Sequence, residues 1–339
     1  MPGRSAMDSH LPSLSVVAPC FNEEHVLPEF IRRVQCICEQ LGCTYEIVLV
    51  DDGSRDRTWD IIASASNNDS RVLGVCLRRN YGHQLALSAG IAAAAGALIL
   101  LIDSDLQDPP EHLPAMIELM KATDADVVYG QRSRRAGETL FKRFSASAFY
   151  RFINWLSDIE IPRDTGDFRL ITRDVADVLS QMPEQHRFIR GMVAWIGGRQ
   201  VPYVYDRMER YAGITKYPLR RMIRFATDAI TGFSRRPLQF ATGLGIVAFL
   251  VSISLALYSI TSWALGHSVP GWTSLMTVVG LLSAFQFVML GVLGEYVGRL
   301  YEESRGRPLF IEAARVGEGL RLIRPRQLDP SIARRGIGK

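Results

Sequence analysis

Short apolar runs alternate with amphipathic stretches from residue 14 to residue 130 of the chain. The amphipathic stretches repeat their apolar positions at helical spacing, as in residues 26–41, whereas the apolar runs have the length of buried strands. This alternation predicts a series of β-α-β units, and therefore an α/β fold with a mostly parallel sheet and flanking helices. The runs that we predict as strands are residues 14–18, 46–50, 72–77, 98–102 and 127–129.

Two further stretches complete this part of the chain. Residues 85–95 are rich in alanine and apolar nearly all round, which predicts a helix buried tightly against the sheet. From residue 131 to residue 217 the periodicity weakens and arginines multiply, so we expect loops and helices there that complete a site.

The composition changes abruptly near residue 238, because residues 238–294 contain no Asp, Glu, Lys or Arg. Two spans within this region, residues 238–265 and 272–294, are each long enough for the roughly 20 residues that cross a bilayer. Buried core helices are the alternative, but two such long uncharged stretches in succession are unusual in a soluble domain. We therefore predict a C-terminal transmembrane hairpin of two helices.

Basic residues flank this hairpin on both sides, which places both flanks in the cytoplasm by the positive-inside rule. They are Arg220, Arg221, Arg224, Arg235 and Arg236 before it and Arg299, Arg305 and Arg307 after it. Residues 217–237 mix basic and apolar side chains, which predicts an amphipathic juxtamembrane segment on an anionic leaflet; a solvated helix is the alternative. Residues 1–13 are polar and lack the apolar core of a secretory signal, so we expect a flexible N-terminus and a domain that starts in the cytoplasm.

Charge and cysteine content exclude two other classes of function. The 39 basic and 35 acidic side chains nearly cancel, which argues against a nucleic-acid partner. The five cysteines lie in the N-terminal quarter without CxxC spacing, so we interpret them as reduced thiols rather than as zinc ligands.

The segment that follows the fourth predicted strand carries the clearest chemical signal. Asp103, Asp105 and Gln107 alternate along the chain, and alternate side chains of an extended segment point the same way, so the three could hold one hard cation. Such a cation could neutralise a diphosphate as it leaves. A strand-end turn with solvated aspartates is the alternative, which the buried strand before it and the prolines after it make less favourable.

A second carboxylate pair, Asp51 and Asp52, ends the second predicted strand. Carboxylates followed by a glycine and a helix start can accept hydrogen bonds from a base and a ribose hydroxyl. Pro19 and Glu23 close the first predicted strand in a similar way, and the carboxyl ends of parallel strands share one edge of a sheet. We therefore expect a single pocket bounded by the ends of these three strands, with Asp56 or Ser54 capping the next helix.

These motifs together resemble a known family. The segments APCFNEE, VDDGSRDRT and IDSDLQDPPE, in this order, are similar to the signature of family 2 glycosyltransferases with the GT-A fold. The later segments GDFRL and RYAGITKYPL, followed by a two-span hairpin, resemble the polyprenyl-phosphate glycosyltransferases of that family. The resemblance implies a GT-A catalytic domain over residues 14–216 and a cytoplasmic tail over residues 295–339. It also implies a multi-pass protein of a bacterial-type inner (plasma) membrane, with its catalytic domain in the cytoplasm.

The resemblance implies contacts for the donor and the metal at the motif positions of this chain. Asp51 and Asp52 would hold the nucleoside with help from Pro19 and Glu23. The metal, Mg²⁺ or Mn²⁺, would bind with the donor diphosphate at Asp103, Asp105 and Gln107.

The same resemblance implies a set of cations for the phosphates of the donor or the lipid acceptor, namely Arg132, Arg135, Arg210 and Lys216. It assigns a direct part in catalysis to Asp105, Lys216 and Asp167. Many relatives have TSGFR where this chain has TGDFR, so Asp167 adds a carboxylate. That carboxylate is either a base or a positioning residue, unless it simply pairs with Arg169 or another arginine.

The expected reaction is an inverting transfer of a sugar, with glucose from UDP-glucose as the first choice, to undecaprenyl or another polyprenyl phosphate. A dolichyl or polyprenyl-phosphate mannose synthase that uses GDP-mannose is an alternative. A non-catalytic, membrane-tethered protein that binds nucleotide sugars is another, although the intact motifs argue against it. Relatives of this type assemble as oligomers, so a homo-oligomer is also implied.

Overall fold

A computed structural model describes residues 12–132, 165–206, 236–266 and 271–317 of the chain. The described strands form one sheet in the order β7-β5-β6-β4-β1-β2-β3-β8. Their bounds are β1 (Leu14–Cys20), β2 (Tyr45–Asp51), β3 (Val72–Leu77), β4 (Leu98–Leu101), β5 (Val127–Arg132), β6 (Thr165–Thr172), β7 (Gln200–Tyr205) and β8 (Glu312–Val316). All five predicted strands are therefore present.

The centre of the sheet is parallel, as the alternating pattern predicts. β1 pairs in parallel with β2 and β4, and β2 pairs in parallel with β3. β6 lies between β4 and β5 and is antiparallel to both, and β8 is antiparallel to β3 at the edge. Three of the described strands differ from the sequence prediction: β6 and β7 lie where we expected loops and helices, and β8 lies where we expected a tail.

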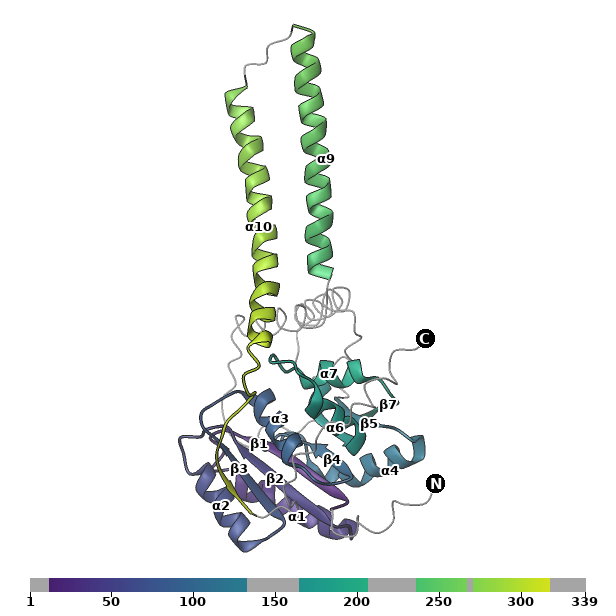
Figure 1. Cartoon of the computed structure of the whole chain (residues 1–339). Helices are drawn as coiled ribbons and strands as arrows, with labels where there is room; N and C mark the ends of the chain where they lie inside the picture. The colour runs from purple at the N-terminus through teal and green to yellow at the C-terminus, as the bar shows by residue number, and fades with distance from the viewer. Residues whose placement is uncertain (1–11, 133–164, 207–235, 267–270, 318–339) are drawn as a thin grey trace, which may run out of the picture.

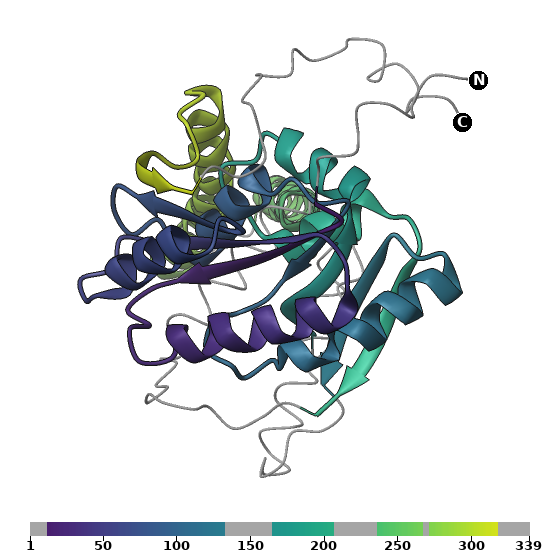
Figure 2. The ribbon, with the colours of Figure 1, turned by 90° about the horizontal axis from the view of Figure 1, so that it is seen from below.

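Helices cover both faces of the sheet. α1 (Leu27–Leu41), α2 (Thr58–Asn68), the short 3₁₀ helix η1 (Pro110–His112) and α4 (Leu113–Thr123) precede or follow the central strands. Figure 2 shows α1 and α4 side by side across one face. α3 (His83–Ala93), α6 (Arg173–Gln181) and α7 (Ile189–Ile196) pack on the other face, which lies nearer to the two long helices in Figure 1.

Close packing explains the alanine-rich composition of α3. A Cβ atom built on Gly90 would come within 2.3 Å of Val17 Cγ1 on β1, so the helix lies nearly against the strand. The side chains of Ala86, Leu87, Ala89 and Ile91 are all buried there. The predicted buried helix is α3, and its N-terminus is consequently held at the carboxyl edge of the sheet.

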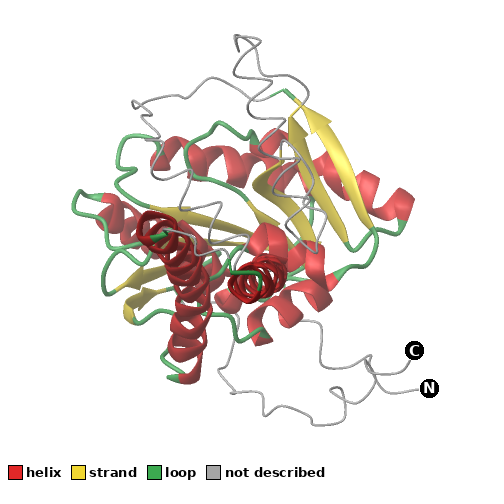
Figure 3. Ribbon diagram, turned by 90° about the horizontal axis from the view of Figure 1, so that it is seen from above, coloured by secondary structure: helices red, strands yellow, loops and turns green. Residues whose placement is uncertain are grey.

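Two long helices, α9 (Arg236–Ala264) and α10 (Trp272–Ser304), project away from the sheet (Figures 1 and 3). Residues 240–262 and 277–304 within them are long and apolar enough to cross a membrane. Their apolar side chains are exposed, as for Phe249 at 63% and Phe287 at 72%, so they are not core helices of this domain. The predicted juxtamembrane segment lies almost entirely outside the described residues.

Candidate active site

The loops after β1 and β2 are tied together by backbone groups at the carboxyl edge of the sheet. The backbone N–H of Asn22 donates to Ser54 Oγ at 3.0 Å, and that of Glu23 donates to Thr58 Oγ1 at 2.8 Å. Asp56 Oδ1 accepts the backbone N–H of Thr58 at the start of α2, but the N-cap position is Arg57, so neither Asp56 nor Ser54 is the N-cap that we expected. The predicted convergence of the β1 and β2 ends is therefore present in the structure.

The two adjacent aspartates at the end of β2 have different partners. Both are buried, Asp51 at 2% and Asp52 at 3% exposure. Asp51 Oδ1 accepts the backbone N–H of Ser54 at 3.2 Å. The two carboxylate oxygens of Asp52 accept the backbone N–H groups of Tyr81 at 2.7 Å and Gly82 at 2.9 Å. Asp52 thus holds the start of α3, and its predicted contact with a nucleoside stays a prediction.

This arrangement brings two loops very close together. Gly53 has a φ of +68°, and a Cβ atom there would lie 2.6 Å from the backbone carbonyl carbon of Arg79. Only glycine fits both the backbone conformation and the space. Burial raises the pKa of Asp52, against the lowering effect of its two backbone hydrogen bonds.

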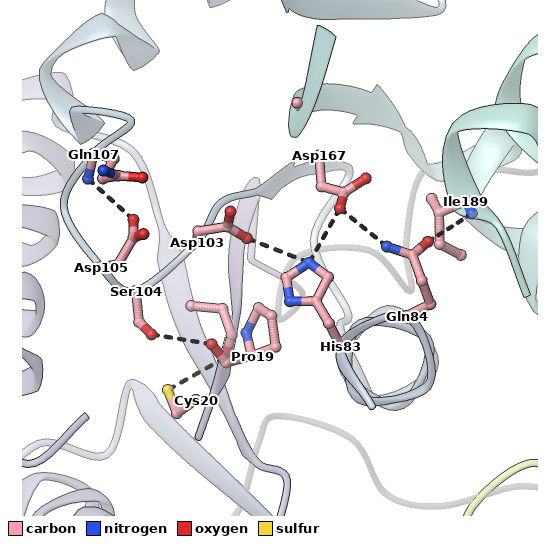
Figure 4. A network of polar contacts seen from close by, with 12 residues as sticks. Pro19, Cys20, His83, Gln84, Asp103, Ser104, Asp105, Gln107, Asp167 and Ile189 are labelled. Carbon is pink, nitrogen blue, oxygen red and sulfur yellow. Dashed lines mark hydrogen bonds and ion pairs between the residues drawn. The ribbon is translucent and has the colours of Figure 1, made fainter. Parts of the chain in front are cut away.

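The segment after β4 is a turn rather than an extended chain. Leu106 has a φ of 58° and is buried at 4% exposure, so the direction of the backbone changes between Asp105 and Gln107. Asp105 Oδ1 accepts the backbone N–H of Gln107 at 3.1 Å. Figure 4 shows Asp103 turned toward His83 and Asp105 turned toward Gln107. Our argument from an extended chain is therefore wrong, because a buried leucine with a left-handed backbone interrupts it.

The residue types of this turn still suit a divalent cation. Among the residues that the structure describes, no three His, Cys, Asp or Glu side chains are grouped to hold a metal ion. Asp103 Oδ1 is nevertheless buried without a hydrogen bond, 3.4 Å from His83 Nε2. Carboxylate and amide oxygens are the donors that Mg²⁺ and Mn²⁺ prefer. The predicted metal is therefore compatible with the oxygen atoms that this turn offers, from the side chains of Asp103, Asp105 and Gln107.

Asp167 is the centre of a polar network that sequence reasoning did not find (Figure 4). It lies on β6, and its side chain is only 5% exposed. Oδ1 accepts Arg190 Nε at 2.7 Å, and Oδ2 accepts Gln84 Nε2 at 3.0 Å and lies 3.1 Å from His83 Nε2. The arginine partner is Arg190 of α7, not the neighbouring Arg169, whose Nη2 donates to the backbone carbonyl of Gly166.

The charges of this network shift the pKa values of its members. Burial raises the pKa of Asp167, but the charges and hydrogen bonds of Arg190 and His83 outweigh it and hold the pKa well below its usual range. Burial lowers the pKa of His83, but Asp167 and Asp103 outweigh it and raise the pKa to about 9. Burial raises the pKa of Asp103 to about 6, against the opposing charge of His83.

The turn that follows β4 also makes a buried contact with β7. The Tyr205 hydroxyl, at the end of β7, donates to Asp108 Oδ1, and Asp108 is fully buried. Arg132 ends β5 beside β6, since a Cβ atom on Gly166 would lie 3.0 Å from its Nη2. Arg132 therefore lies next to Gly166, the residue that precedes Asp167, and its predicted contact with a phosphate stays a prediction.

Several predicted residues cannot be placed in the same way. Arg135, Arg210 and Lys216 lie outside the described residues. The residues that sequence reasoning missed are His83, Gln84, Arg190 and Tyr205. The sequence does contain a signal for His83 and Gln84. They follow a glycine after the third predicted strand, at the edge of the sheet where the other site residues lie.

Comparisons with known proteins give this site a family. The model of Glycosyl transferase family 2 matches residues 15–179. The chain is 41% identical to the uncharacterized glycosyltransferase YkcC of Bacillus subtilis, over 95% of this chain and all of that one. It is 38% identical to a prophage bactoprenol glucosyl transferase homolog of Escherichia coli and to the bactoprenol glucosyl transferase of Shigella phage SfV. Each alignment covers 88% of this chain and 97% of the relative.

A solved structure is also similar to part of the chain. Glucosyl-3-phosphoglycerate synthase from Mycobacterium tuberculosis, in complex with Mn²⁺, uridine diphosphate and phosphoglyceric acid, is 20% identical with a TM-score of 0.43. The match covers 65% of this chain and 76% of that one. This similarity is too distant to support a conclusion about a metal or a donor here.

Proposed function

We propose that this chain, which belongs to glycosyltransferase family 2, transfers a sugar from a nucleotide donor to the phosphate of a polyprenyl lipid. The chain is a glycosyltransferase, and the acceptor and the sugar are the proposal. The observation that carries it is identity of 38% over 88% of the chain to proteins named bactoprenol glucosyl transferase. These relatives favour a glucosyl group, with UDP-glucose as the donor.

The donor lies at the carboxyl edge of the sheet in this proposal. Asp51, Pro19 and Glu23 contact the nucleoside, and Asp52 keeps the adjoining loop in place. Asp103, Asp105 and Gln107 would hold Mg²⁺ or Mn²⁺, which would supply positive charge for the diphosphate of the donor.

The reaction is a single inverting displacement: an oxygen of the lipid phosphate forms a bond to the anomeric carbon while the bond from that carbon to the donor diphosphate breaks, and the nucleoside diphosphate leaves. A phosphate monoester has a second pKa of about 6 and is mostly dianionic at neutral pH, so it needs little help from a base. The protein's main tasks are therefore to hold two anionic groups close together and to align them. We propose Arg132, Arg135, Arg210 and Lys216 for this work, and the position of Arg132 beside Gly166 supports its part in it.

The long helices explain how such an acceptor is reached. α9 and α10 cross the membrane as a hairpin, and the basic residues at both flanks keep the catalytic domain on the cytoplasmic side. The lipid phosphate then lies at the bilayer surface, near the domain that uses it. The exposure of apolar side chains along both helices supports this arrangement.

The test is transfer in membranes that contain the full chain. Radiolabelled UDP-glucose and undecaprenyl phosphate, with Mn²⁺ or Mg²⁺, should give a lipid product that mild acid hydrolyses. EDTA should abolish the product and added Mn²⁺ or Mg²⁺ should restore it, while Asp105→Asn membranes serve as the inactive control. A product from GDP-mannose alone would make the chain a mannose synthase. No product from any nucleotide sugar would favour a binding protein without catalysis.

A further inference from the structure

Both carboxylate oxygens of Asp167 accept hydrogen bonds from side chains of the protein. Oδ1 accepts Arg190 Nε at 2.7 Å, while Oδ2 accepts Gln84 Nε2 at 3.0 Å and Arg190 Nη2 at 3.2 Å and lies 3.1 Å from His83 Nε2. The side chain is 5% exposed. A general base must come within hydrogen-bonding distance of the proton that it takes. At 5% exposure, Asp167 offers little surface on which a substrate proton could come that close.

Two partners of Asp167 have side chains that are much more exposed to solvent than that of Asp167 itself. The His83 side chain is 42% exposed and that of Arg190 is 33% exposed. Both project from the starts of helices, α3 for His83 and α7 for Arg190. What this part of the site presents to a ligand is therefore a pair of nitrogen donors backed by a buried carboxylate.

Gln84 joins the two helix starts that carry this pair. Its Oε1 accepts the backbone N–H of Ile189 at 2.8 Å, and its Nε2 donates to Asp167. Because Ile189 directly precedes Arg190, this contact fixes the first turn of α7 against the first turn of α3 (Figure 4). The orientation of Arg190 is thus set by a bidentate contact to Asp167 and by a backbone contact through Gln84.

We propose that Asp167 is a positioning residue, not the base, and that Arg190 and His83, held by it, bind a phosphate group of a substrate. This inference rests on the proposed function. A guanidinium has five N–H donors and suits phosphate oxygens, and here the contacts of Arg190 Nε and Nη2 with Asp167 keep the plane of the group oriented. His83 Nε2 also lies 3.4 Å from Asp103 Oδ1, so the bound phosphate would be next to a predicted metal ligand.

Two phosphates in the reaction share this chemistry, the acceptor's monoester and the donor's diphosphate. The experiment uses the full chain in detergent, with Asp167→Asn, Arg190→Gln and the double variant. Arg32→Gln, an exposed arginine on α1, is the control for loss of one positive charge. We measure the KM for a polyprenyl phosphate, kcat at saturation, and the Kd for UDP by calorimetry.

Arg190→Gln should weaken the binding of one of the two phosphate groups by about 10- to 100-fold. This is the loss in affinity expected when a hydrogen bond to a charged group is removed. A rise in the acceptor KM alone would identify the lipid phosphate, and a rise in the UDP Kd would identify the diphosphate. Asp167→Asn should change the same parameter, and the double variant should be no worse than Arg190→Gln alone. That non-additivity is expected because one residue acts through the other.

The inference would be overturned if Asp167→Asn abolished kcat at saturation while Arg190→Gln kept wild-type KM, Kd and kcat. Arg190→Lys keeps the charge without the fork, so partial recovery in a folded variant separates phosphate binding from a structural defect. Should the wild type transfer no sugar, the proposed function fails. The Kd for UDP and the Kd for a polyprenyl phosphate, measured in wild type and in Arg190→Gln, would still decide the inference, because it is refuted if the variant binds both ligands as tightly as the wild type does.

Discussion

Replacing Asp52 by asparagine separates two roles of the carboxylate pair at the end of β2. Asp52 is 3% exposed, and each of its oxygens accepts one backbone N–H, from Tyr81 at 2.7 Å and from Gly82 at 2.9 Å. Asparagine keeps the shape but replaces one oxygen by an NH₂ group. That group would face a backbone N–H, so one hydrogen bond is lost and a buried donor is left without a partner.

The expected cost follows from these contacts. Losing one hydrogen bond to a charged, buried group costs about 2–3 kcal/mol. For a domain of this size, 1 kcal/mol corresponds to a Tm change of about 2–4 °C. Asp52→Asn should therefore lower the Tm of the catalytic domain by about 4–12 °C. Because the affected loop leads directly into α3, the variant should also lower kcat through His83 and Gln84.

Asp51→Asn is the matched control, since Asp51 has a single backbone partner, the N–H of Ser54 at 3.2 Å. It should change the Tm less and the Kd for UDP more than Asp52→Asn does. Thermal unfolding and calorimetric titration with UDP measure both variants. A wild-type Tm for Asp52→Asn together with a greatly raised Kd for UDP would show that Asp52 contacts the nucleoside, and would refute the reasoning.

Three other changes test the packing and charge of the fold. Gly90→Ala should lower the Tm, because its Cβ would lie 2.3 Å from Val17 Cγ1 and overpacking costs about 1–3 kcal/mol; an unchanged Tm would contradict the close contact. Asp69→Asn should destabilise the domain by about 1 kcal/mol at pH 7. A hydrogen bond from Arg71 lowers the pKa of Asp69, so this contribution is present above about pH 4 and is lost as the pH falls through the lowered pKa. Denaturant midpoints of the two proteins should therefore converge at low pH, and a constant difference would argue against the charge. Ending the chain before β8 should lower the Tm and promote aggregation, because it exposes the edge of β3, and size-exclusion chromatography would detect a monodisperse product that contradicts this.

The parallel centre of the sheet could be predicted because its signals are local. Each central strand is an apolar run, and amphipathic stretches separate these runs. The rule that ligands gather at carboxyl ends then selects Pro19, Asp51 and Asp103 without a structure. The same rule points to the loop after the third strand, which contains His83. His83 was missed because it lies six residues beyond the end of β3, whereas the predicted residues lie at or close to the ends of their strands.

The rest of the site depends on pairings that the pattern does not encode. β6 inserts between β4 and β5, which puts Asp167 opposite the segment that follows β4. Nothing local in TGDFRL distinguishes such a strand from a loop, since its burial comes from strands distant in the sequence. Arg190 is harder still, because it reaches Asp167 from a helix of eight residues. The turn at Leu106 depends on a buried side chain, so an argument from alternation alone could not find it.

Contacts between segments that are distant in the sequence also fix the position of the end of α10. His186 Nε2 lies 2.6 Å from Glu302 Oε2 near the end of α10, and Gln185 Nε2 donates to the backbone carbonyl of Arg307 at 2.9 Å. An exposed ion pair contributes little by itself, but here the chain continues into β8, whose ladder with β3 fixes it to the sheet. The loop that receives these contacts leads within four residues to Arg190. The end of α10 therefore contacts the segment that leads to Arg190 and the network around Asp167. The predicted boundary at residue 295, between the hairpin and the tail, falls inside α10 and does not coincide with a boundary in the packing.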